Sequence, residues 1–201
     1  LSWTSIAMPT TQPINDVRFV SPAQGWQVCA NGTVFITADS GATWTMSNGA
    51  MEMEALARNS AGELLTVGYC GAIGRSDDGG ASWTSEREGP TSQLLDVYAF
   101  DDEHAWAVGN SGRTLRTTDG GDHWTEVLTG ANWSLTGVHF TDTLNGWTCG
   151  YYGNLFHSTD GGVSWTPDTT FGTPIFSDVQ FTDAQHGWLS TQSRMLYRTV
   201  D

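Results

Sequence analysis

The sequence contains no lysine, so all eight of its basic residues are arginine, against 22 aspartate and glutamate residues. The resulting net charge of −14 would repel the phosphate backbone of DNA or RNA. We therefore do not expect nucleic acid as a partner.

Cysteine and long apolar runs are also scarce. The three cysteines, Cys29, Cys70 and Cys149, cannot all pair within one chain, and we expect three small buried or half-buried residues rather than a bridge. No Cys-x-x-Cys pair or histidine cluster indicates a metal site, and nothing indicates a cofactor. No apolar run approaches the ~18 residues that cross a bilayer, so no membrane insertion is predicted.

The composition bears on the compartment as well. A lysine-free, acidic sequence with 24 glycines and 10 tryptophans is compatible with a protein from a salt-rich habitat or with a secreted or periplasmic protein. We expect the latter, although no signal segment is present in the sequence.

One motif, Ser/Thr-x-Asp-x-Gly-x-x-Trp, organises the whole sequence. Complete copies lie at residues 37–44, 76–83, 117–124 and 158–165. The closing tryptophan stands alone at Trp3, and the opening half stands alone at residues 199–201. Successive closing tryptophans are 39 or 41 residues apart, a period typical of propeller blades.

The residue types of the motif fit a tight turn between two strands. Its aspartate can accept hydrogen bonds from backbone N–H groups of the same loop, and its glycine permits a backbone that a side chain would obstruct. Its tryptophan then anchors the next strand in the core. We assign a structural role to Asp39, Asp78, Asp119, Asp160, Asp201, Trp3, Trp44, Trp83, Trp124 and Trp165.

The segments between the motifs repeat one pattern of short strands. Alternating runs separated by turn residues indicate antiparallel strands rather than helices. Five first strands are recognisable, at residues 16–20, 55–58, 96–98, 137–140 and 178–181. A second aligned position holds Trp26, Leu65, Trp106, Trp147 and Trp188.

These patterns predict an all-β fold, a β-propeller of four-stranded blades of about 41 residues that forms one domain over residues 1–201. We expect five blades and a monomer. The N-terminal strand 3–6 is expected to pair with the C-terminal strand, because this closure would remove a free sheet edge. A trimmed or engineered fragment of a larger propeller is the alternative.

Four complete motifs and a split fifth resemble the Asp-box, or BNR repeat, of sialidases, sortilin-type receptors and photosystem II assembly-factor-like proteins. The repeat Asp-Val-x-Phe, Gly-Trp, Val-Gly-x-x-Gly, Thr-Asp-Gly-Gly-x-x-Trp is most similar to the last group, the photosystem II stability or assembly factors. The resemblance implies Asp-boxes on the periphery of a propeller. It also implies a non-enzymatic scaffold for a protein or ligand, which that group binds through an arginine-rich patch.

Aromatic side chains in irregular loops are the first candidate binding site. Trp133 lies outside the repeat, and Tyr151 and Tyr152 occupy a hairpin between a second and a third strand. Loops on a regular scaffold often carry function, so these rings could form a surface for a peptide or a carbohydrate. The alternative is that they fill gaps between blades.

An arginine register is the second candidate. Arg75, Arg116 and Arg198 each stand directly before an Asp-box. They could bind carboxylates of a partner, or each could pair with an acid of its own blade.

We predict that the chain is not an enzyme. The Arg-Ile-Pro motif of sialidases is absent, and the acidic pairs are explained as turn and surface residues. The alternative is a glycan-binding or glycan-hydrolysing BNR protein of the sialidase or xyloglucanase type.

Overall fold

A computed structural model describes residues 3–48, 52–87 and 92–200 of the chain. In these ranges the chain forms five antiparallel sheets, joined by turns and by three single-turn 3-10 helices. The structure confirms the predicted all-β fold and the five repeated sheets. No helix in these ranges has the length and apolarity needed to cross a bilayer.

The five sheets follow the chain in order, and we number them 1 to 5. Sheet 1 contains β1 (Ile14–Phe19), β2 (Gly25–Cys29), β3 (Thr33–Thr37) and β4 (Thr45–Asn48). Sheet 2 contains β5 (Met53–Arg58), β6 (Leu64–Gly68), β7 (Ala72–Ser76) and β8 (Thr84–Arg87). Sheet 3 contains β9 (Leu94–Ala99), β10 (Ala105–Gly109), β11 (Arg113–Thr117) and β12 (Thr125–Leu128).

The last two sheets are shorter. Sheet 4 contains β13 (Leu135–Phe140), β14 (Gly146–Gly150), β15 (Leu155–Ser158) and β16 (Thr166–Pro167). Sheet 5 contains β17 (Phe176–Phe181), β18 (Gly187–Thr191) and β19 (Leu196–Thr199). The 3-10 turns η1 (Tyr69–Gly71), η2 (Asn110–Gly112) and η3 (Tyr151–Gly153) join the second and third strands of sheets 2, 3 and 4.

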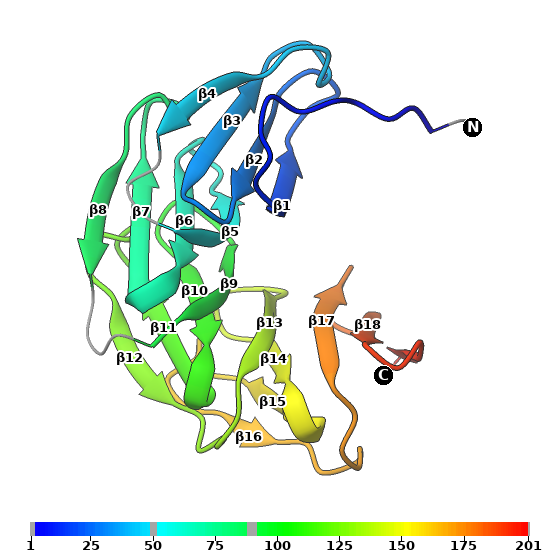
Figure 1. Cartoon of the computed structure of the whole chain (residues 1–201). Helices are drawn as coiled ribbons and strands as arrows, with labels where there is room; N and C mark the ends of the chain where they lie inside the picture. Colours follow the sequence, from blue (N-terminus) through cyan, green and yellow to red (C-terminus); the bar gives the residue numbers. More distant parts are fainter. Residues whose placement is uncertain (1–2, 49–51, 88–91, 201) are drawn as a thin grey trace.

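Neighbouring sheets contact each other mainly through their first strands, β1, β5, β9, β13 and β17. Figure 1 shows the sheets arranged in an arc, with these strands toward its inside and the fourth strands outside. The hairpins between second and third strands therefore lie at one end of the sheets, and the Asp-boxes lie at the other.

Each complete Asp-box closes with the same hydrogen bonds. In sheet 3, Asp119 Oδ1 accepts the Thr117 hydroxyl at 2.8 Å and the backbone N–H of His123 at 2.9 Å. Thr117 Oγ1 in turn accepts the N–H of Gly121 at 2.9 Å. The backbone N–H of His123 is the largest of the contacts that hold the pKa of Asp119 near 2. Asp201 lies outside the described residues.

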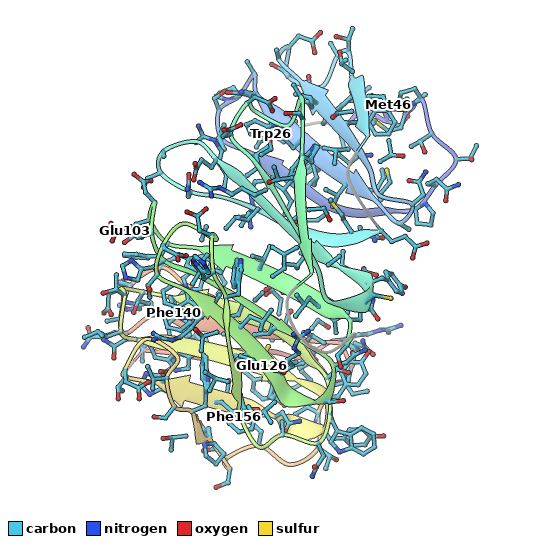
Figure 2. All side chains as sticks on the ribbon, turned by 90° about the vertical axis from the view of Figure 1, so that its left-hand side faces the viewer. Trp26, Met46, Glu103, Glu126, Phe140 and Phe156 are labelled. Carbon is cyan, nitrogen blue, oxygen red and sulfur yellow. The ribbon has the colours of Figure 1, made fainter. Side chains whose placement is uncertain are left out.

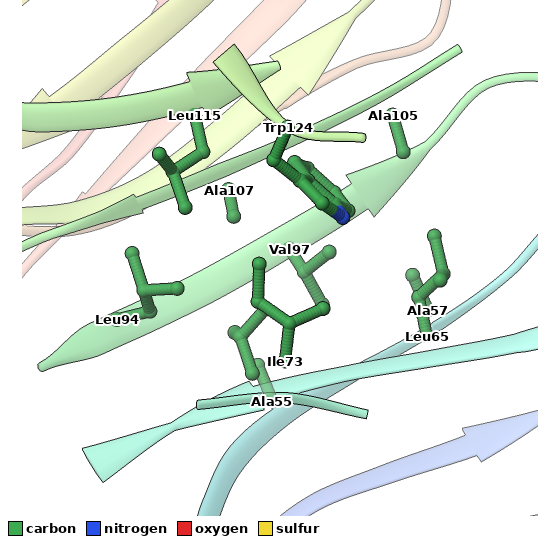
Figure 3. Packing of buried hydrophobic residues seen from close by; sticks show 11 residues of the cluster. Ala55, Ala57, Leu65, Ile73, Leu94, Val97, Ala105, Ala107, Leu115 and Trp124 are labelled. Carbon is green, nitrogen blue, oxygen red and sulfur yellow. The ribbon is translucent and has the colours of Figure 1, made fainter. Parts of the chain in front are cut away.

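The hydrophobic core is built at the junctions between sheets. Figure 3 shows Trp124, 7% exposed, packed among Leu65 and Ile73 of sheet 2 and Leu115 of its own sheet. Tryptophans of second strands also bind the next box, because Trp106 Nε1 donates to the Gly161 carbonyl at 2.9 Å. Trp26 donates in the same way to Gly79 at 2.8 Å; Figure 2 marks Trp26 at its junction.

The structure corrects the prediction that the terminal strands pair. Sheet 5 has three strands, residues 3–13 form no strand, and Trp3 is 100% exposed. Residues 6–13 lie against sheet 1 instead: the Pro13 carbonyl accepts the Ala30 N–H at 3.1 Å, and Ile6 lies over Gly41. Figure 1 shows β1 and β17 on opposite sides of the opening of the arc.

The cysteine prediction is confirmed in part: Cys29, Cys70 and Cys149 are all free, but Cys70 was expected to be at least half-buried. Cys29 and Cys149 are buried, and Cys70 is exposed in η1. Burial raises the pKa of the Cys149 thiol well above its usual value, as expected for a thiol that acts as a small core residue.

Candidate functional site

The structure brings Trp133 and Tyr152 together. Trp133 lies in the loop between β12 and β13, and Tyr152 is the middle residue of η3. Their ring centroids are 4.4 Å apart with an angle of 36° between the planes. The two residues are 50% and 51% exposed, so they form a continuous aromatic surface rather than a buried contact.

The backbone of η3 places Tyr152 unusually. Its φ of 59° lies in the left-handed region, as do those of Cys70 and Ser111 at the equivalent positions of η1 and η2. This conformation costs a non-glycine residue about 1–2 kcal/mol. The conformation is a shared property of the three hairpins, and in sheet 4 it places a large ring next to Trp133.

The loop of Trp133 is fixed on both sides by backbone hydrogen bonds. The Trp133 carbonyl accepts the N–H of Gly112 at 2.9 Å, and the Ser134 carbonyl accepts the N–H of Tyr151 at 3.0 Å. Ser134 Oγ also donates to Asn110 Oδ1 at 2.8 Å. The loop thus ties η2 of sheet 3 to η3 of sheet 4, and these bonds fix the backbone that carries the two rings.

The polar atoms of the Trp133 and Tyr152 side chains are available to a ligand. Among the described residues, neither Trp133 Nε1 nor Tyr152 Oη has a hydrogen-bond partner. Tyr151, the third predicted aromatic residue, is half-buried and contributes its backbone N–H to the loop. We therefore define the aromatic pair as Trp133 and Tyr152.

The arginine register lies at the opposite end of the third strands, next to the Asp-boxes. Arg75 pairs with Glu63 at 2.8 Å and also with Asp122 of the next box. The Arg75 hydrogen bond is the main cause of the lowered pKa of Glu63. The charge of Arg75 is therefore matched within the chain, across the junction of sheets 2 and 3.

The other two register arginines have different surroundings. Arg116 is half-buried on β11 and reaches toward Gly161 in the box of sheet 4. Arg198 is exposed on β19, which belongs to sheet 5. The register therefore places the three arginines on three different sheets, at the same end of the third strands.

Sequence reasoning missed a set of inner carboxylates. Asp16, Asp96 and Asp178 occupy one aligned position on first strands and line a pocket of about 310 Å³ inside the arc. Burial raises the pKa of Asp96 to about 7, and burial lowers the pKa of the neighbouring His139 to about 4. The repeated dipeptide Asp-Val in alternate units was the available signal.

These carboxylates serve the backbone rather than a metal. Asp96 Oδ1 accepts the N–H of Val97, and Asp96 Oδ2 accepts the N–H of Val138 in sheet 4, both at 2.9 Å. In residues 3–48, 52–87 and 92–200, no three histidine, cysteine or acidic side chains are arranged to hold a metal ion.

Comparison with solved structures identifies relatives of this fold. A structure described as YCF48 bound to D1 peptide superposes with a TM-score of 0.78 at 20% identity, covering 100% of this chain and 68% of that chain. YCF48 from Cyanidioschyzon merolae gives 0.75 at 15% identity, covering 97% and 69%. An ancestral GH74 enzyme gives 0.71 at 17% identity, covering 91% and 29%. At these identities the likeness shows the fold alone.

Sequence comparison is more specific. No curated protein matches the chain. The family model described as photosynthesis system II assembly factor YCF48 matches residues 1–87 and 89–170, which is most of the chain. Together with the Asp-box geometry, this match shows that the chain belongs to the YCF48 family of photosynthesis system II assembly factors.

Proposed function

We propose that this chain is a non-enzymatic scaffold that binds a segment of another protein on the aromatic pair. The observation that carries the proposal is the exposed contact between Trp133 and Tyr152, held by a loop that is bonded to two hairpins. Tryptophan and tyrosine dominate the energetics of protein interfaces, because they supply large contact areas with few rotatable bonds.

Family membership supports a protein ligand. One relative has been solved with a peptide, the structure described as YCF48 bound to D1 peptide. The net charge of −14 favours a neutral or basic segment for this chain. A proline, aromatic or arginine side chain would stack on the rings, and the arginine would add a cation–π attraction.

The hydrogen bonds of the Asp-box carboxylates and of Asp96 support a binding role without catalysis. The Asp-box carboxylates Asp78, Asp119 and Asp160 have pKa values of about 2 and are committed to closing turns. Asp96 is committed to two backbone amides. None of these groups is placed as a free acid and base pair.

The test is a binding screen with matched variants. A synthetic array of short peptides of varied charge and a glycan array are each probed with the parent protein. Trp133→Ala and Tyr152→Ala are then measured on the best peptide, with Tyr69→Ala as the control, since Tyr69 is an exposed aromatic residue of the η1 hairpin.

We expect a loss of at least about tenfold in affinity for the two site variants, which corresponds to ~1.4 kcal/mol, and no loss for Tyr69→Ala. Equal affinities of the parent and both site variants would show that the peptide binds elsewhere on the protein. Binding to glycans and to no peptide would replace the proposal with the glycan-binding alternative.

A further inference from the structure

The segments that carry the aromatic pair, and those bonded to them, contain no charged residue. They are η2, η3, the loop 129–134 that holds Trp133, and residues 169–174, whose Pro174 carbonyl accepts the N–H of Gly153 at 2.7 Å. Arg113 follows η2, but its side chain is 1% exposed and pairs with Glu126. In a chain with a net charge of −14, these four segments therefore favour an uncharged ligand.

The free polar groups of this surface are mainly hydrogen-bond donors. Ser134 Oγ donates to Asn110 Oδ1 at 2.8 Å, which leaves Asn110 Nδ2 without a partner among the described residues. Trp133 Nε1 is a further donor, since indole has no acceptor atom, whereas the Tyr152 hydroxyl both donates and accepts. A ligand that presents hydrogen-bond acceptors and flat apolar faces matches these groups.

A polyproline II segment has both properties. Proline has no backbone N–H, so a proline-rich segment presents carbonyl acceptors and few donors. The conformation has no internal hydrogen bonds, and with three residues per turn and a rise of about 3.1 Å, neighbouring proline rings face different sides. Two neighbouring prolines can therefore contact two inclined rings, and the planes of Trp133 and Tyr152 are inclined by 36° with centroids 4.4 Å apart.

We propose that the segment bound on the aromatic pair is uncharged and proline-rich, in the polyproline II conformation. This inference rests on the proposed function and narrows its ligand class. Prolines of the segment stack on the two rings, while Trp133 Nε1 and Asn110 Nδ2 donate to its carbonyls, a mode of recognition that aromatic surfaces use for such segments. The segment is extended before it binds, so it loses little conformational entropy.

The absence of charge separates this ligand from the two other classes. A basic segment would gain affinity from a carboxylate beside the rings, and the four segments carry none. The hydroxyl groups of a glycan need acceptors as well as donors, and the same absence of carboxylates disfavours them.

Matched peptides test the ligand class. The probe is a capped, uncharged peptide with the repeat Pro-Pro-Gln. Serine replaces every proline in a second peptide, and a third peptide with the repeat Ser-Ser-Arg is basic. At physiological ionic strength, which limits non-specific attraction to the acidic chain, the parent should bind the proline peptide at least about tenfold more tightly than either control. Trp133→Ala should lose at least about tenfold for the proline peptide, and Tyr69→Ala should lose nothing.

Asn110→Asp tests the donor with a nearly isosteric change. The variant keeps an acceptor for the Ser134 hydroxyl, but a negatively charged acceptor replaces the Nδ2 donor. It should bind the proline peptide at least about fivefold more weakly and the arginine peptide more tightly than the parent does. Asn31→Asp is the matched control. It adds the same charge in the hairpin between β2 and β3, keeps the acceptor for the Thr33 N–H, and should bind both peptides like the parent.

The results distinguish this inference from the proposed function. A serine or arginine peptide that binds as tightly as the proline peptide, and is lost in Trp133→Ala, would overturn the proline assignment but keep the aromatic pair as a peptide site. Absent binding of the proline peptide, or binding that Trp133→Ala leaves unchanged, would also overturn the inference, and the peptide array then decides the proposed function by itself. A glycan that binds the parent and is lost in Trp133→Ala would replace both.

Discussion

The carboxylate of Asp96 accepts the backbone N–H of Val138 at 2.9 Å, so a side chain of sheet 3 fixes the innermost strand of sheet 4. Asp16 binds Leu56 of sheet 2 in the same way at 3.0 Å. The receiving sheets carry a small residue, Ala55 or Gly137, at the aligned position. A Cβ on Gly137 would come within 2.9 Å of Asp178 Oδ1, which explains the glycine at this position.

The first prediction concerns Asp96 and pH. Burial raises the pKa of Asp96 from 3.8 to about 7 in the folded protein, so folding favours the protonated form. Its contribution to stability is therefore full below pH ~4 and is lost as the pH rises toward 7, by at most ~4 kcal/mol. Asp96→Asn removes this titration, and urea unfolding of parent and variant from pH 4 to 8 measures the difference.

The stability of the parent relative to Asp96→Asn should fall with rising pH in this window. A relative stability that rises would show that the two amide donors, which favour the charged carboxylate, outweigh burial. Asp119→Asn is the contrasting variant: the pKa of Asp119 is lowered to about 2, so its contribution is lost only as the pH falls from ~4 toward 2.

The second prediction concerns the Asp-box. Asp119→Ala removes the acceptor for the Thr117 hydroxyl and for the His123 N–H, which should cost about 1–3 kcal/mol. Peptide binding should persist, because the box lies at the opposite end of the sheets from the aromatic pair. Urea unfolding and a peptide titration on the same sample give both values. A variant of parental stability that has lost the ligand would reverse the structural assignment of this aspartate.

Much of the fold could be predicted because its signals are local. The Asp-boxes and the aligned tryptophans fix where strands begin, and even the unit at Ala55 to Arg58, which lacks the Asp-Val dipeptide of other units, forms β5 as expected. The prediction that the terminal strands pair was wrong, because the repeat does not encode which sheet the N-terminal segment contacts. Ile6 and Pro13 contact sheet 1, and those contacts hold the N-terminal segment there.

The candidate site was less predictable. Trp133 could be selected because it lies outside the period, but its contact with Tyr152 depends on a left-handed residue in another sheet. Arg75 and Asp122 are 47 residues apart, and only the packing of sheets 2 and 3 brings them together. The register of the arginines was visible in the sequence, and the partners of Arg75 were not.

The third prediction separates strain from binding at Tyr152. Tyr152→Gly relieves the left-handed backbone, a gain of about 1–2 kcal/mol, and loses the ring contact with Trp133, a cost of ~0.5–1.5 kcal/mol. The net change in unfolding free energy should be close to zero, while the peptide affinity falls as for Tyr152→Ala. Thermal unfolding and titration check the two parts. A loss of stability well above ~1.5 kcal/mol would show that the Tyr152 ring serves mainly to pack the fold.

The fourth prediction assigns different roles to the register arginines. Arg75→Gln breaks the pairs with Glu63 and Asp122, and it should lower stability by up to ~1 kcal/mol, because both pairs are partly exposed. Arg198→Gln removes an exposed charge on β19 and should leave stability unchanged. Urea unfolding of the two single variants measures the contrast, and a larger loss for Arg198→Gln would contradict it.

The same variants decide whether the register binds a partner. If Arg198, Arg116 and Arg75 attract carboxylates, the triple glutamine variant should bind an acidic peptide more weakly than the parent and with a smaller dependence on salt. Arg75→Gln alone should change this binding little, because its charge is already matched by Glu63. Affinity is measured at two ionic strengths for parent, single and triple variants. Identical affinities and identical salt slopes would exclude the arginine register as a binding site. Trp133 and Tyr152 would then remain as the binding surface, because the stacking of rings depends little on salt.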